Sequence, residues 1–443
     1  MAVQNNRYIQ YLQALQRPFK KLTKLEFLNP DNSVAFSIGS SYKDVKLNRN
    51  ITNAFIQGGQ LNVSTNNGVR RSATVTLSNL DGSFSYAVNK IWFGQRLRLS
   101  MGLVLPDGTD FYLPQGVFYI KEPQELYNPT TKTVSFPLVD KWAYLDGTLA
   151  GNIGNAFQIT TKDKPKIFDA IKGVLQLSKY TYLSTTNEFD MIDNVEPVFT
   201  NYYDGKTYAV ASGDGTTTTT VNVTDLPYDI TENAGGNLGN VVTSLVECFS
   251  GMVGYDQTGM LRVDPSQDDI SDNNKPILWA FTPKNSNLLG IEDKHKNTEV
   301  YNDIVVVGEG LTGYEVWGQA SNYDPASPTN INMIGLKTHY ENKAEYWNSQ
   351  QCVDIAEWML KRKTVLNKSV TIRSSQMFHL MENSLISVER TDKKGSPIER
   401  HLIESFSIPL GETGEMTINA TSVNDFPIIT KKQYSTQQGV TNG

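Results

Sequence analysis

The stretch Gly94–Asp140, GQRLRLSMGLVLPDGTDFYLPQGVFYIKEPQELYNPTTKTVSFPLVD, carries the pattern that decides the fold. Apolar and polar residues alternate from Leu97 to Leu103, and Pro106-Asp107-Gly108 follows as a turn. Alternation returns from Val117 to Lys121 and again from Val134 to Leu138. A period of two predicts strands with one buried face, because successive side chains of a strand point to opposite sides.

A second stretch, residues 383–425, repeats this order. Its strands are predicted over Leu385–Arg390, Leu402–Ser407 and Met416–Ala420, and a turn at Asp392–Gly395 separates the first two. The order and the lengths of strands and turns match those of the first stretch, although few residues are identical. We interpret the two stretches as copies of one β-barrel module, and chance resemblance between two β-meanders is the alternative.

The whole pattern predicts an α+β, β-dominated fold class, with two similar small β-barrel domains and interspersed mixed α/β domains. From Leu22 to Asp140, about seven or eight strands follow one another, and Asn66-Asn67-Gly68 is one of the hairpin turns between them. Apolar residues at helical spacing predict later helices around residues 167–175, 241–249 and 352–363.

These patterns divide the chain into six segments. We expect an N-terminal arm or helix at 1–20, a first β-barrel domain at 21–155, a mixed α/β domain at 156–275, a β-rich segment at 276–345, a helix plus the second β-barrel at 346–425 and a flexible tail at 426–443. Tyr8, Tyr11 and Leu15 can share one helical face, so the first segment fits either a loosely held arm or a partner-binding helix.

Length and charge exclude some classes of protein. The 443 residues predict about two to four domains. Surfaces that grip nucleic acid are normally basic, whereas this chain has a formal net charge of −6, so DNA is expected to slide past it without specific binding. The N-terminus lacks the apolar core of a signal peptide, and no apolar run approaches the ~18 residues of a membrane span, so no membrane insertion is expected.

One string resembles a dinucleotide-binding motif. Gly308, Gly310 and Gly313 follow the apolar strand Ile304–Val307, but the motif also needs a helix whose N-terminus faces the pyrophosphate. The next residues, Tyr314–Trp317, have the pattern of a strand. We therefore interpret the glycines as part of a β-turn region and predict no cofactor.

The cysteines and histidines give no catalytic or metal pattern. Cys248 and Cys352 both lie in apolar helical patterns and are interpreted as core residues, with a bridge between them as the alternative. A Cys352–His339 pair is a further alternative to core packing, because active sites assemble across distance. The four histidines share no metal-ligand spacing with one another or with the cysteines: His295, His339, His379 and His401.

An acidic loop is the remaining candidate site. Asp264, Asp268, Asp269 and Asp272 could offer oxygen ligands to calcium, but their spacing is not that of an EF-hand, so a solvated loop is the preferred interpretation. Aromatic residues alternate with polar ones in the predicted strands, so core packing explains them before glycan stacking does. We predict no catalytic, cofactor-binding or metal-binding residues.

Four stretches carry a resemblance when they are taken in order. They are residues 116–123 leading into 134–147, the helix–hairpin unit 245–265, residues 301–308, and the helix 352–363 followed by 382–388 and the C-terminal strands. Their order over residues 20–425 resembles the baseplate hub and tail-tip proteins of long-tailed bacteriophages and contractile injection systems. None of the four is a catalytic motif.

The resemblance implies a non-enzymatic virion protein of the tail tip or baseplate, made in a bacterial cytoplasm. It implies a homotrimer in which two barrel domains per chain form a pseudo-sixfold ring, with residues 276–345 contributing to that ring. Such a ring would join the sixfold tail tube to a threefold tip and leave a channel for DNA ejection. The net negative charge of the channel walls would discourage DNA from adhering to them.

Several partners follow from the same resemblance. They are the tail tube or distal tail protein, a tip spike, fibre or receptor-binding protein, and the tape measure protein. Some family members continue into a peptidoglycan-degrading domain, and this sequence ends shortly after its last predicted strands. The alternatives are a receptor- or glycan-binding tail protein and a cell-wall hydrolase that uses scattered carboxylates.

Overall fold

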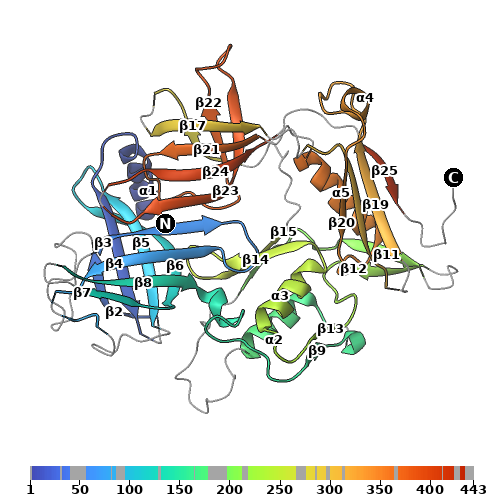
Figure 1. Ribbon diagram of the computed structural model, residues 1–443, viewed down its shortest axis with the longest axis horizontal. Helices are drawn as coiled ribbons and strands as arrows, with labels where there is room; N and C mark the ends of the chain where they lie inside the picture. Colours follow the sequence, from blue (N-terminus) through green and yellow to red (C-terminus); the bar gives the residue numbers. More distant parts are fainter. Residues whose placement is uncertain are drawn as a thin grey trace.

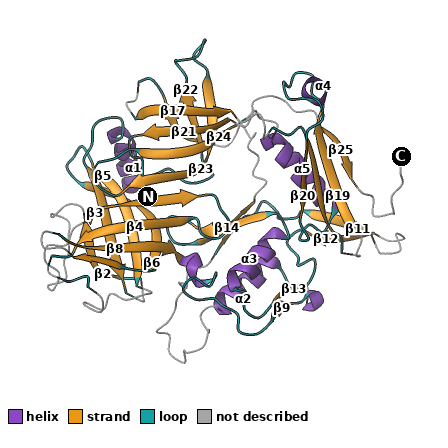
Figure 2. Ribbon diagram, in the orientation of Figure 1, coloured by secondary structure: helices purple, strands orange, loops and turns teal. Residues whose placement is uncertain are grey.

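Strands dominate the computed structural model of the chain, which confirms the predicted β-dominated α+β fold class (Figure 2). The structure describes residues 2–29, 32–39, 56–80, 82–85, 95–127, 131–163, 165–177, 197–211, 218–265, 276–284, 287–295, 300–311, 315–363, 368–411, 413–423 and 430–434.

A 14-stranded sheet brings together strands from both ends of the sequence (Figure 1). Its N-terminal strands are β1 (Lys21–Leu28), β2 (Val34–Gly39), β3 (Ile56–Ser64), β4 (Arg71–Ser78), β5 (Arg96–Val104), β6 (Asp110–Ile120), β7 (Gln124–Tyr127) and β8 (Lys132–Asp140). Its C-terminal strands are β16 (Ile277–Phe281), β17 (Leu288–His295), β21 (Lys368–Ser374), β22 (Leu385–Glu389), β23 (Ile398–Pro409) and β24 (Met416–Ser422). The main path runs β17-β21-β24-β23-β3-β4-β8-β6-β5-β1-β2.

The two predicted copies of a module have the same pairing pattern within this sheet. β5-β6-β8 pair as antiparallel neighbours in the first copy, and β22-β23-β24 do so in the second. Each copy continues through two more antiparallel strands, β4 and β3 in the first and β21 and β17 in the second. Even an irregularity recurs, because the register shifts between Ile56 and Gly58 of β3 and between Leu288 and Gly290 of β17.

The copies are joined edge to edge rather than separated by a linker. Strand β23 pairs antiparallel with β3, from Ser405 opposite Ser64 to Pro409 opposite Gln60. The described strands do not close either copy into a barrel of its own. Sequence periodicity specified which face of each strand is buried, but it carries no information about which strand edges meet. A single apolar core lies under both copies, with Leu61, Phe136 and Ile418 among its members.

A mixed α/β unit follows the first copy. Helices α2 (Ile167–Leu177) and α3 (Leu238–Glu247) pack together with the three-stranded sheet β10 (Val198–Phe199), β15 (Leu261–Pro265) and β14 (Gly251–Tyr255). Two-stranded sheets complete it: β9 (Phe157–Ile159) with β13 (Ile230–Glu232), and β11 (Thr207–Ala211) with β12 (Thr218–Asn222). The helix predicted at 241–249 begins earlier, because the side chain of Asn237 caps it by accepting from Asn240 N.

A four-stranded sheet with one covering helix forms the remaining part. It consists of β18 (Asp303–Glu309), β19 (Glu315–Asn322), β20 (Thr338–Asn342) and β25 (Thr430–Tyr434), and α4 (Ile331–Ile334) precedes β20. Helix α5 (Ser349–Lys363) packs on β18 and β19. The expectation of a flexible tail at 426–443 was wrong for residues 430–434, since β25 pairs with β19; residues 426–429 and 435–443 lie outside the described part of the chain.

The N-terminal helix α1 (Ala2–Ala14) packs within its own chain instead of standing away as an arm. Tyr11 and Leu15 are fully buried in the central core. The hydroxyl of Tyr11 accepts from Phe378 N at 2.9 Å and lies 3.1 Å from His379 Nδ1. In the part of the chain that the structure describes, no helix is both long and apolar enough to cross a membrane.

Candidate functional site

The solvent face of six neighbouring strands around the join between the copies, β8, β4, β3, β23, β24 and β21, is uniform in chemistry. Inward-pointing side chains such as Leu61, Val75 and Ile418 are buried, and their sequence neighbours point outward. The outward set consists mainly of Ser, Thr, Asn and Gln side chains that are half-buried or exposed: Gln60, Asn62, Ser72, Thr74, Thr76, Ser135, Thr371, Ser405, Ser407, Thr417 and Asn419. We call this set the polar face.

Hydrogen bonds run across the strands of the polar face. Thr371 Oγ1 lies 3.2 Å from Asn419 Oδ1, and Asn419 Nδ2 donates to Ser405 Oγ at 3.1 Å. Arg373 and Glu292 are among the few charged side chains on this side of the described strands, and Arg373 already lies 3.5 Å from Glu415. Neutral groups that satisfy one another offer little to a polyanion, because nucleic-acid binding depends on clustered cations.

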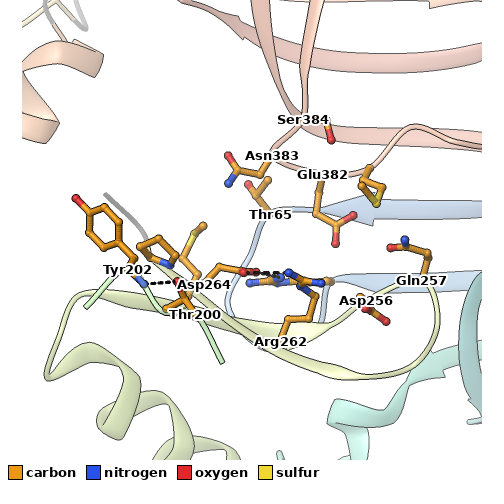
Figure 3. A pocket seen from close by; sticks show the side chains of 14 residues that line it. Thr65, Thr200, Tyr202, Asp256, Gln257, Arg262, Asp264, Glu382, Asn383 and Ser384 are labelled. Carbon is orange, nitrogen blue, oxygen red and sulfur yellow. Dashed lines mark hydrogen bonds and ion pairs between the residues drawn. The ribbon is translucent and has the colours of Figure 1, made fainter. Parts of the chain in front are cut away.

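A cavity of about 510 Å³ lies where both copies meet the mixed α/β unit (Figure 3). The turn between β3 and β4 forms one wall with Thr65 and Arg70, the β14–β15 hairpin forms another with Asp256 and Arg262, and the loop before β22 forms a third with Met381, Glu382, Asn383 and Ser384. Each wall comes from a different part of the sequence. The cavity is therefore a junction of three structural parts.

Arg70 is the most unusual residue at this junction cavity. Its side chain is only 5% exposed, and its closest carboxylate, Asp264, is 3.8 Å away. Its Nε and Nη2 atoms have no hydrogen-bond partner among the described residues, and burial lowers the pKa of its guanidinium. Gly254 of β14 makes room for it, because a Cβ there would lie 2.4 Å from Arg70 Cδ.

A buried charge network lies beside the cavity and ties the two copies together. Arg71 Nη2 lies 2.6 Å from Glu382 Oε2, and Arg71 Nη1 donates to the carbonyl of Gln115 at 3.0 Å. Asp140 Oδ2 accepts from the backbone N–H groups of Arg70 and Arg71 at 2.9 and 3.0 Å. Burial raises the pKa of Asp140 to about 6, against the opposing effect of these donors.

The turn between β3 and β4 also docks onto the mixed unit. Gly68 N donates to the carbonyl of Val253 at 3.0 Å, and Val253 N donates to Asn67 Oδ1 at 3.0 Å. Gly68 has φ +83°, a left-handed conformation that glycine adopts without strain. The predicted Asn66-Asn67-Gly68 hairpin turn thus also acts as a connector between structural parts.

The candidate sites considered from sequence are not brought together into a reactive centre. Gly308 lies in β18 and Gly310 just after it, and the next element is strand β19, as predicted, so no helix follows; Gly313 lies outside the described residues. Asp264 lines the junction cavity, whereas Asp268, Asp269 and Asp272 fall outside the described residues.

Both cysteines are buried and free, which agrees with the core interpretation. Burial raises the pKa of each thiol to about 12, which opposes nucleophilic behaviour. Cys352 packs in the core of the four-stranded sheet, whereas His339 lies 3.5 Å from Glu341. No group of three or more His, Cys, Asp or Glu residues suited to a metal ion occurs among the described residues.

Sequence reasoning missed the Arg71–Glu382 pair. Arg71 and Glu382 are 311 positions apart, and neither stands in a recognisable motif. The one available signal was Arg70-Arg71 at the start of a strand that otherwise alternates small polar and apolar residues, since two arginines there need partners once buried.

Solved structures of tail proteins share this architecture. No protein-family model matches the sequence, and no curated protein matches it significantly. A tail protein from Neisseria meningitidis MC58 aligns with TM-score 0.55 and 9% identity over 91% of this chain and 97% of its own. The 43 kDa tail protein of prophage MuSo2 from Shewanella oneidensis aligns with TM-score 0.52 and 10% identity over 90% of this chain and 98% of its own. The chain therefore has the fold of phage tail proteins, as the sequence resemblance predicted.

Proposed function

We propose that this chain is a non-enzymatic structural subunit of a phage-type tail tip or baseplate hub, and that it works as a homotrimeric ring. The observation that carries the proposal is the duplicated module. Two copies with the same strand pairings lie side by side in one sheet, so three chains would present six similar units around an axis. Such a ring matches a sixfold tail tube on one face and a threefold spike, fibre or receptor-binding protein on the other.

The polar face supports a role as the wall of a channel for DNA. It spans the neighbouring strands β8, β4, β3, β23, β24 and β21, and its Ser, Thr, Asn and Gln side chains give it few charges. DNA would neither bind to such a wall nor be strongly repelled. The sequence led us to expect that net negative charge keeps DNA from adhering to the wall. On the polar face, weak adhesion of DNA would come mainly from the shortage of cations.

The trimer is tested by the mass of the purified protein. A monomer of 49.4 kDa predicts a trimer of three times that mass, about 148 kDa, in native mass spectrometry and light scattering. Negative-stain images should show a ring with a central hole. A protein that remains at the monomer mass at high concentration, or that forms particles without a hole, contradicts the proposal.

The wall is tested by adding cations to it. The variant Asn62→Lys/Thr74→Lys/Asn419→Lys should retain duplex DNA in a fluorescence-anisotropy titration at low salt, and the retention should fall steeply as salt is raised. The wild-type ring should show little binding. A matched control places three lysines at exposed neutral positions off the polar face, Gln158, Asn332 and Asn342. Equal retention by both variants would argue against a wall at the polar face.

A further inference from the structure

The join between the two copies shows how this sheet connects one module to the next. Strand β23 uses its last residues, Ser405–Pro409, to pair with β3. Ile408 lies opposite Leu61, and both side chains are fully buried. Ser407 lies opposite Asn62, and these side chains belong to the polar face.

The partners of this join have equivalents in the other copy. In the first copy Ile120 lies opposite Leu138, and in the second copy Ile403 lies opposite Ala420. When these two pairs are taken as equivalent, Gln124 of β7 corresponds to Ser407, and Glu125 corresponds to Ile408. The spacing agrees, because both Gln124 and Ser407 come four residues after the matched isoleucine. β7 is therefore the first copy's equivalent of the joining end of β23.

The same matching makes β17 the equivalent of β3. The strand pairings from β8 through β4 to β3 correspond to those from β24 through β21 to β17. In this correspondence Asp293 takes the position of Leu61, and Lys294 takes the position of Asn62. The bulge supports this register independently, since it falls before Gly58 in β3 and before Gly290 in β17.

In contrast to β23 and β3, these two equivalents have open edges within the described strands. β7 pairs with β8 alone, and β17 pairs with β21 alone at the end of the sheet. Leu126 and Tyr127 of β7 are 63% and 72% exposed. An unpaired strand edge presents backbone donors and acceptors that a matching strand can satisfy.

We propose that β7 of one chain pairs antiparallel with β17 of a second copy of the chain, in the register by which β23 pairs with β3 inside each chain. This interface rests on the proposed trimer and names the surface that builds it. Each chain offers one edge of each kind, so the contact is head-to-tail and closes into a ring when three copies meet. The central sheets would then form one continuous wall around the axis.

The register places specific side chains opposite one another. Gln124 would face Lys294 on the polar side, and Glu125 would face Asp293 on the core side. Two carboxylates would repel, but Asp293 already lies 3.0 Å from Arg390 Nη1 and 3.9 Å from Lys393 Nζ. Those two cations would therefore lie close to the incoming Glu125, but Arg390 also pairs with Asp392 at 2.7 Å and Lys393 with Glu399 at 2.5 Å. The paired edge would hold four carboxylates against two cations, and the backbone hydrogen bonds of the two strands would have to outweigh that repulsion.

Disulfide trapping tests this pairing. Directly opposite residues of an antiparallel pair have Cα atoms about 4.5–5.5 Å apart, within the range that a disulfide spans. The double variant Gln124→Cys/Lys294→Cys should form, under mild oxidation, covalent dimers and trimers that dithiothreitol reverses. The native Cys248 and Cys352 are buried, and each single-cysteine variant supplies the background.

A matched control uses the join inside the chain. Asn62→Cys/Ser407→Cys should link the equivalent positions within one monomer, which peptide mass mapping detects without a change in chain number. Suppose that the control forms its disulfide and the wild-type protein has the mass of a trimer. If Gln124→Cys/Lys294→Cys then forms no covalent dimer or trimer, the proposed edge pairing is wrong while the trimer stands.

The remaining outcomes separate the two proposals. A wild-type protein of monomer mass overturns the trimer itself, and the edge pairing with it. A covalent ladder that continues beyond three chains supports the edge pairing and overturns closure into a trimer.

Discussion

The join inside the chain and the two open edges share one pairing geometry but differ in the side chains they bury. At the join, Leu61 and Ile408 meet in the core. At the equivalent positions of the open edges, Asp293 and Glu125 take their places. Inward-pointing charges on an edge strand discourage association with unsuitable partners, because those partners would have to bury them. The difference shows how one module can be joined permanently on one side and remain selective on the other.

A second contrast concerns how charges are held. Beside the junction cavity, Arg71 of the first copy and Glu382 of the second form a pair whose side chains are 1% and 9% exposed. At the edge formed by β17, Asp293 and Arg390 are 19% and 8% exposed, and Arg390 also contacts the solvent-exposed Asp392. The inner pair is locked inside the protein, whereas the outer cluster retains access to water and can rearrange when a partner arrives.

The largest effect is expected from breaking the inner pair. Arg71→Ala should lower the free energy of unfolding by about 3–5 kcal/mol, because Glu382 would be left buried without its partner. The shift of the urea midpoint, followed by tryptophan fluorescence, measures this loss. The control Arg373→Ala breaks a pair whose members are 60% and 49% exposed, and it should cost about 0–1 kcal/mol. Equal losses would remove the contrast between inner and outer pairs.

The next effect tests the equivalence of Ile408 and Glu125. Ile408→Ala should cost about 2–5 kcal/mol, since it leaves a cavity in the join. Glu125→Ala changes the equivalent position on a strand that is exposed in the single chain, so at dilutions where light scattering gives the monomer mass it should alter the unfolding free energy by about 0.5 kcal/mol or less. Both values come from the same denaturation experiment. A large loss from Glu125→Ala would mean that β7 is not an open edge.

A pH effect is expected where α1 packs on the second copy. Burial lowers the pKa of His379 to about 4, so the folded state holds this ring neutral, close to Tyr11, Tyr8 and Trp279. The resulting stability is fully present above the unfolded pKa near 6.5 and is lost as pH falls toward 4, by about 3 kcal/mol in total. Urea midpoints measured between pH 7 and pH 4 follow this loss.

The variant His379→Asn isolates that contribution. It cannot take up the proton, so its stability should fall less than that of the wild type over the same pH range. Asp140 has a raised pKa of about 6, so its contribution has the opposite sign and gains strength as pH falls. Asp140 is present in both proteins, and the difference between them therefore reports His379. Parallel pH profiles would show that His379 is not buried in the neutral form.

Local periodicity predicted the strands of both copies and their order, because alternation of a residue such as Val134 with its neighbours depends only on which face is buried. It also predicted the strand after Gly310, where a cofactor-binding helix would be needed. The joining of β23 to β3, the Arg71–Glu382 pair and the placement of β25 on β19 escaped prediction. Each depends on contacts between residues far apart in sequence, for which local patterns carry no information.

The smallest effect separates the polar face from the core beneath it. Asn419 bridges Thr371 and Ser405 across three strands of the second copy, whereas the equivalent position of the first copy is Pro137, which has no such side chain. Asn419→Ala should therefore cost only about 0.5–1 kcal/mol, since water can replace hydrogen bonds on an exposed face. The neighbouring Ile418→Ala, on the buried side, should cost about 2–5 kcal/mol. A loss above about 2 kcal/mol for Asn419→Ala would mean that the polar face is structural and not the water-lined wall proposed for the channel.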